Sequence, residues 1–158
     1  MVDPHRWFRK AEVNYKNFLT NKEDAARHVG EDIEMDYLGE SAYNASQCAE
    51  KWLKGVCVLL GAELNDDHKL ARQIILLREK MPTLLEGIEA YGVTLAKYNT
   101  LGRYPDDNRH FSHRDHASAE RALTHIRNEM IRISLDQRVE FLGYDYIDYN
   151  SSRNDTRL

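Results

Sequence analysis

Apolar residues recur at three- and four-residue steps along most of the chain, and this period predicts α-helices rather than strands. The first helix is expected to begin after Asp3, which is an N-cap acceptor followed by a proline. It is expected to run to about Lys22 or on toward His28, with Gly30 as its stop. The acidic piece 31–36 that follows is interpreted as a connection between two helices.

The clearest helical pattern covers about residues 38–60, which contain no proline. Its apolar stripe consists of Ala45, Ala49, Trp52, Leu53, Val56 and Leu60. The opposite face carries Gln47, Glu50, Lys51 and Lys54, and the spacing of Glu50 and Lys54 fits a weakly stabilising ion pair. Such a polar set either lines a nucleotide groove or is the solvated face of an amphipathic helix, and the solvated face is the more common case.

Two shorter helices are predicted next. The third is expected to follow the aspartate pair 66–67 and to end at Pro82, because proline cannot continue a helix. Its inner stripe is Leu70, Ile74, Leu77 and Met81. The fourth is expected to be capped by Thr83 and to reach about Tyr98.

The last helix is expected to begin near Ser118 and to end at about Leu135, and no strand signal appears before that point. The sequence therefore predicts an all-α fold, an up-and-down bundle of four to five helices over residues 1–135. Residues 136–158 are predicted to form a polar, Tyr-containing tail that is partly disordered.

Composition places this bundle among soluble globular proteins. The chain has 158 residues, a length that suits one domain, with 42% hydrophobic and 30% charged residues. A net charge of −4 excludes a broadly basic nucleic-acid coat. Cys48 and Cys57 would lie about 13 Å apart on one helix, too far for a disulfide. Together with the lack of an apolar signal segment or membrane-length window, this favours a reduced, cytoplasmic protein with no membrane contact.

The connection from Tyr98 to His110 concentrates groups that handle phosphate. It contains a glycine, a proline and two aspartates, so a regular helix across it is not expected. The basic groups of this stretch and of the residues directly after it are Arg103, Arg109, His110, His113, Arg114 and His116. The stretch is therefore locally basic within an acidic chain.

The histidines of this region also raise the possibility of a metal site. His110, His113 and His116 follow each other at steps of three, with Asp115 and His125 nearby. Steps of three drift by about 60° around a helix, no cysteine lies close, and no HExxH pattern is present. No metal and no cofactor are therefore expected.

Three ordered pieces of the sequence resemble the HEPN family of small helical domains. Residues 47–54, Gln-Cys-Ala-Glu-Lys-Trp-Leu-Lys, are similar to the Gln-x-x-Glu-Lys-x-x-Lys helix of that family. His-Lys-Leu at 68–70 is similar to its His-x-Leu, and Arg-Tyr-Pro-Asp within 98–106 to its Arg-Tyr-Pro turn before the last helix. The resemblance covers about residues 5–135.

This resemblance implies a helical bundle that forms homodimers. In many members an Arg-x(4–6)-His motif cleaves RNA without metal where two copies meet, and Arg103 and His110 have that spacing, with six residues between them. Nuclease members often carry a polar residue directly after the arginine, whereas Tyr104 stands here.

The chemistry assigns a role to each residue of the motif. Arg103 would bind phosphate and stay charged, and His110 would act as general acid or base near neutral pH. Tyr104, Asp106 and Arg109 are the candidate substrate-binding residues, with Asp106 orienting the histidine and Arg109 holding a flanking phosphate. The alternative is that Arg103 only caps helix-end carbonyls and that His110 is a solvated loop residue.

Two main hypotheses about function remain open, beside a third in which the chain is a metal-binding helical bundle that uses the histidine cluster. The first is a metal-independent endoribonuclease that serves as the toxin of a toxin–antitoxin or defence module, with a minimal nucleotidyltransferase as its antitoxin partner. The second is a non-catalytic HEPN module that binds nucleotide, RNA or a partner nucleotidyltransferase.

Overall fold

The computed structural model describes residues 3–64, 70–81, 86–98 and 111–137, and over these residues the protein is entirely helical. The five helices of this part are α1 (Pro4–Arg27), α2 (Asp32–Leu59), α3 (Leu70–Lys80), α4 (Glu86–Ala96) and α5 (His113–Asp136). This confirms the predicted all-α bundle. The predicted tail lies, from residue 138 onward, outside the described residues, as do the aspartate pair 66–67 and Thr83.

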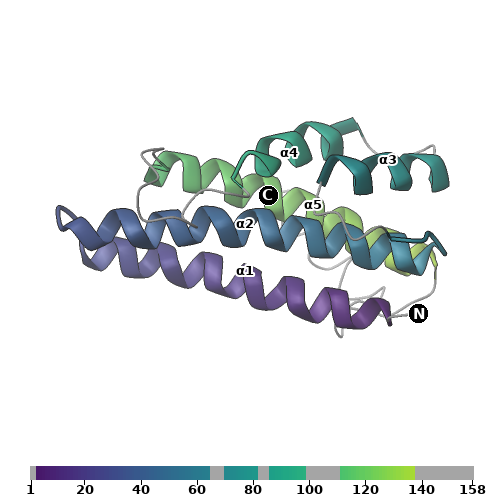
Figure 1. Ribbon diagram of the computed structural model, residues 1–158, viewed down its shortest axis with the longest axis horizontal. Coiled ribbons are helices and arrows are strands. Elements are labelled where there is room, and N and C mark those ends of the chain that lie inside the picture. Colours follow the sequence, from purple (N-terminus) through teal and green to yellow (C-terminus); the bar gives the residue numbers. More distant parts are fainter. Residues whose placement is uncertain (1–2, 65–69, 82–85, 99–110, 138–158) are drawn as a thin grey trace, which may run out of the picture.

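Helix α2 is the centre of the bundle. It contacts α1, α3, α4 and α5, and Figure 1 shows α1 and α2 as two long antiparallel helices with α3 and α4 on the other side of α2. No helix in the described part of the chain is long and apolar enough to cross a membrane.

Both ends of α1 are set by local signals. At its start, Asp3 accepts a hydrogen bond from the His5 backbone N–H at 2.9 Å. After its end, Gly30 lies in the short turn to α2 and adopts the positive φ of 84° that favours glycine. The prediction that residues 31–36 form a connection is wrong, because α2 already begins at Asp32. Asp32 and Glu34 lie in its first turn, where negative charge is stabilised by the helix dipole.

Because α2 has neighbours around most of its circumference, its polar face is not solvated. Gln47, Glu50 and Lys54 are 9%, 3% and 4% exposed. Lys54 Nζ lies 2.7 Å from Glu50 Oε1 and 5.3 Å from the ring centroid of Trp7 in α1. The predicted ion pair is confirmed, but the interpretation of this face as solvated is wrong for these three residues. Lys51 is half-buried and donates to Asn14 Oδ1 at 2.6 Å.

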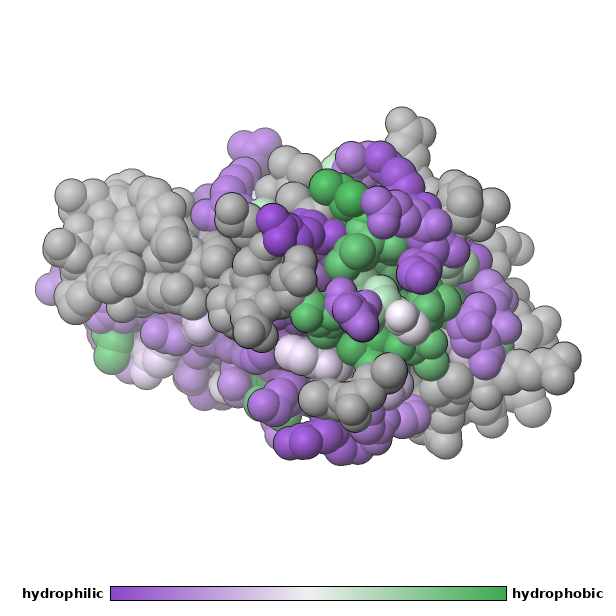
Figure 2. Space-filling model, turned by 45° about the vertical axis from the view of Figure 1, so that its right-hand side comes forward, coloured by the Kyte–Doolittle hydropathy of each residue, from purple (hydrophilic) through white to green (hydrophobic). Residues whose placement is uncertain are grey.

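Hydrophobic residues also remain on the surface. Figure 2 shows one face on which hydrophobic side chains gather, with hydrophilic side chains around them. Ile75 of α3 is 57% exposed and Val13 of α1 is 60% exposed. A face on which exposed apolar side chains gather, as in Figure 2, is typical of sites that contact another protein.

Helix α5 begins earlier than predicted. Ser112 is its N-cap, and Ser112 Oγ accepts from the Asp115 backbone N–H at 3.1 Å while Asp115 Oδ2 accepts from the Ser112 N–H at 2.9 Å. This reciprocal capping box satisfies two amide donors that the helix itself leaves unpaired. The expected start near Ser118 is therefore wrong by more than one turn.

Candidate functional site

The residues of the predicted Arg–His site lie outside the described part of the chain. Arg103, Tyr104, Asp106, Arg109 and His110 all fall within 99–110. The structure therefore leaves their geometry as a prediction. The helices on either side of this segment are described, and they define where its two ends lie.

The two ends of the segment meet in the core. Tyr98 follows α4 and Phe111 precedes α5, and their rings pack edge to face with centroids 4.8 Å apart. Both side chains are buried, at 8% and 3% exposure. The buried contact between the two rings fixes residues 98 and 111 relative to each other, between the end of α4 and the start of α5. His110 is thus one residue from a buried anchor and two residues from the N-cap of a helix.

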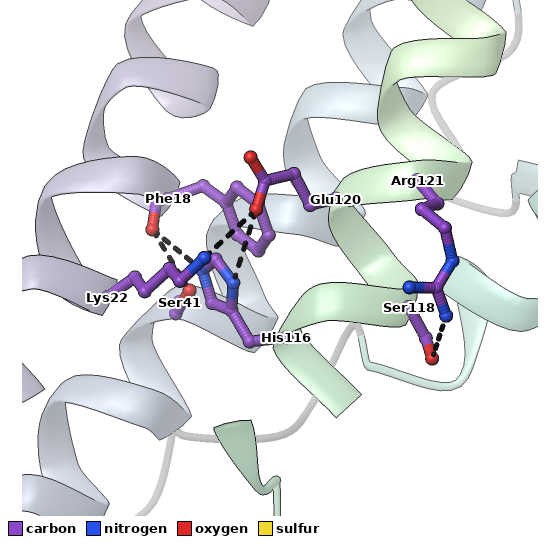
Figure 3. Close-up of polar contacts among 7 residues, drawn as sticks. All are labelled: Phe18, Lys22, Ser41, His116, Ser118, Glu120 and Arg121. Atoms are coloured by element: carbon purple, nitrogen blue, oxygen red, sulfur yellow. Dashed lines mark hydrogen bonds and ion pairs between the residues drawn. The ribbon is translucent and has the colours of Figure 1, made fainter. Parts of the chain in front are cut away.

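His116 does not belong to a phosphate-binding group. Its ring is fully buried and stacks on Phe18 of α1, with centroids 3.9 Å apart and an interplanar angle of 5°. Its Nε2 lies 3.1 Å from the Phe18 carbonyl oxygen, which also accepts from Ser41 Oγ (Figure 3). Burial lowers the pKa of His116, so the imidazole is held neutral. Its expected role in phosphate handling is wrong, because no ligand phosphate reaches a buried ring.

The proposed histidine cluster is also divided by the helix. His113 is exposed, with Nε2 3.3 Å from Glu34 Oε2, while His116 enters the core. Within the described ranges, no group of three or more histidine, cysteine, aspartate or glutamate side chains is arranged to hold a metal ion.

Polar side chains join α1 to α5 next to this point. Glu120 Oε2 lies 3.3 Å from Lys22 Nζ and 4.0 Å from His116 Nδ1 (Figure 3). Further along α5, Arg127 Nε donates to Glu12 Oε1 at 2.7 Å. Both contacts join a side chain of α1 to a side chain of α5, and together they fix the rotation of α5 relative to α1.

A groove that the sequence analysis missed lies along α5. It has a volume of about 530 Å³. Its walls are formed by Tyr91 from α4 and by Ala117, Glu120, Arg121, Thr124, His125 and Asn128 from α5. In Figure 3 the side chain of Arg121 points away from the Lys22–Glu120 pair, toward Ser118, whose Oγ accepts from it at 3.1 Å. The sequence does show polar residues at steps of three and four along the last helix. Tyr91, which turns this face into a groove, lies 26 or more residues before them in the chain, so the sequence alone does not reveal the groove.

Comparison with known proteins gives a match to a protein family. The model of the HEPN domain family matches residues 5–133, which span the five described helices apart from the first residue of α1 and the last three of α5. No curated protein and no solved structure matches the chain.

Proposed function

The chain belongs to the HEPN domain family, and on that premise we propose that it is a metal-independent endoribonuclease that works as a homodimer. The observation that carries the proposal is the position of the Arg103-x6-His110 motif. It lies in a segment whose ends are held together by the buried Tyr98–Phe111 contact, directly before the capped start of α5. A helix N-terminus favours nearby negative charge, as a scissile phosphate carries.

The reaction needs no metal. The 2′-hydroxyl of the RNA loses its proton to His110 and attacks the adjacent phosphorus, and the bond from phosphorus to the 5′-oxygen breaks. The 5′-oxygen leaves as a hydroxyl after taking a proton, and the other product carries a 2′,3′-cyclic phosphate. Arg103 stabilises the negative charge of the pentacoordinate phosphorane. Arg109 holds a flanking phosphate and Tyr104 contacts the RNA beside the bond that is cleaved, while Asp106 orients His110.

A dimer completes this site. A single imidazole must serve as base and then as acid, whereas His110 of the partner subunit supplies the second group. The face of Figure 2 on which hydrophobic side chains gather supports self-association.

The biological role that fits this activity is that of a toxin in a toxin–antitoxin or defence module, paired with a minimal nucleotidyltransferase as antitoxin. The buried free thiols of Cys48 and Cys57 are compatible with action in the reducing cytoplasm. The second candidate function is a non-catalytic module that binds nucleotide, RNA or the nucleotidyltransferase. Tyr104 directly after Arg103 is the observation that favours it.

Cleavage of RNA by the purified protein in excess EDTA tests the proposal. Arg103→Ala and His110→Ala are expected to abolish cleavage without changing helicity or self-association. Arg9→Ala and His5→Ala, which change the same residue types on α1, are the matched controls and are expected to cleave like the parent. The cut ends are expected to be a 2′,3′-cyclic phosphate and a 5′-hydroxyl. Absence of cleavage by the parent, or equal cleavage by all variants, would replace the nuclease with the binding module.

A further inference from the structure

The groove between α4 and α5 has the composition of a nucleotide-binding surface, and the proposed function does not use it. Its α5 residues, from Ala117 to Asn128, recur at helical steps and so form one continuous stripe. Tyr91 of α4 stands along one side. We propose that this groove is a subsite for one nucleotide of single-stranded RNA, with the phosphate at Arg121 and the base against Tyr91 and His125.

The charge of the groove suits a phosphate. Arg121 is exposed, and its hydrogen bond to Ser118 Oγ uses one of the five N–H donors of its guanidinium group. The remaining donors have the planar geometry that binds phosphate oxygens in pairs. Glu120, the one carboxylate that lines the groove, is paired with Lys22 at 3.3 Å, so its charge is offset locally.

The aromatic wall suits a base. The rings of Tyr91 and His125 have centroids 4.7 Å apart at an interplanar angle of 51°, so the two rings pack against each other at one side of the groove. Stacking of a base on such a ring contributes about 1–3 kcal/mol.

Arg121 lies close enough to the start of α5 for one RNA strand to contact both places. Arg121 follows the N-cap Ser112 by nine residues, which is roughly 13 Å along the helix axis. A strand cut at the start of α5 and continuing along that helix would place a following phosphate near Arg121. This step rests on the proposed function, but binding of RNA in the groove does not depend on cleavage.

Fluorescence anisotropy with a short, labelled 2′-O-methyl oligoribonucleotide tests the inference, since that probe lacks the attacking hydroxyl and stays intact. Arg121→Gln is expected to weaken binding about tenfold, the loss of one charge-assisted hydrogen-bonded contact. It is also expected to lower the slope of log affinity against log salt by about 0.7, the value for one phosphate contact on a single strand. Tyr91→Leu is expected to weaken binding with the slope unchanged, because stacking involves no ion release.

Arg9→Gln is the matched control, since it removes the same charge from an exposed position on α1. Equal effects of Arg9→Gln and Arg121→Gln, or no binding of the probe by the parent, would overturn the subsite. The two proposals fail separately. If the parent cleaves RNA but Arg121→Gln binds the probe no more weakly than Arg9→Gln does, the subsite is wrong and the nuclease stands. If Arg121→Gln specifically weakens probe binding but the parent cleaves no RNA, the nuclease is wrong and the subsite stands.

Discussion

Replacing Gly55 with alanine should destabilise the protein, although it removes a glycine from the middle of α2. Gly→Ala in a helix interior normally stabilises by about 1 kcal/mol. At Gly55 a Cβ would overlap Cε1 of Phe8 and lie 2.6 Å from its Cδ1. Phe8 is fully buried in α1, so the ring has no solvent to move into. Overpacking of this kind costs about 1–3 kcal/mol. A rigid ring places the cost near the upper end, which leaves a net loss of about 2 kcal/mol.

Gly92→Ala in α4 is the matched control. Its Cβ would also overlap a side chain, but the atom it meets is the terminal Cδ1 of Ile74, and the next carbon, Cγ1, lies at an ordinary 3.5 Å. Rotation about one bond moves that methyl group. The overlap should therefore largely cancel the propensity gain of about 1 kcal/mol, so that Gly92→Ala stays close to the parent in stability.

Urea unfolding followed by far-UV circular dichroism measures both variants. A double-mutant cycle identifies the cause, because Phe8→Leu removes the ring edge that the new methyl group meets. Phe8→Leu with Gly55→Ala should lose at least about 1 kcal/mol less than the sum of the two single losses. The reasoning is refuted if Gly55→Ala is as stable as the parent, or if the two losses simply add.

Two further predictions concern buried ionisable groups. Lys54→Met should cost about 3 kcal/mol in urea unfolding, the lower end for a broken buried pair, because the buried Glu50 loses its ammonium partner but keeps the hydrogen bond from Gln47. Lys51→Met at the half-buried neighbouring position should cost much less, and similar losses would contradict this. Burial lowers the folded-state pKa of His116, so its contribution to stability is present above the unfolded value of about 6.5 and is lost as pH falls through the folded pKa. In the parent the urea midpoint should therefore fall as pH is lowered below about 6.5, and His116→Gln should make this fall shallower. An equally steep fall in the variant would contradict the conclusion that His116 is buried as a neutral imidazole.

The parts of the fold that depend on local signals could be predicted from the sequence. The start of α1 follows from Asp3 and the proline after it, and its end follows from Gly30, because capping and positive φ are properties of a few adjacent residues. The capping box of Ser112 and Asp115 was a signal of the same kind. The basic residues around it favour instead an interpretation of this stretch as a phosphate-binding connection, which is why the predicted helix began later.

The candidate site divides in the same way. Family membership and the motif of Arg103 and His110 can be recognised from residue order alone, since they are patterns along the chain. The exclusion of His116 required the position of Phe18, 98 residues away, because the chemistry of an imidazole depends on whether its ring is buried.

Hydrophobic period, caps and residue order in the sequence determined the all-α class, the family and the motif, because each of these is encoded in neighbouring residues. Only the tertiary structure decided that α2 lies at the centre, that Glu50 and Lys54 are a buried pair, and that Tyr91 turns one face of α5 into a groove. The physical reason is that burial and local dielectric depend on how many helices surround a side chain. A periodic pattern gives the direction in which a residue faces, and the packing of distant helices determines whether water or protein is there.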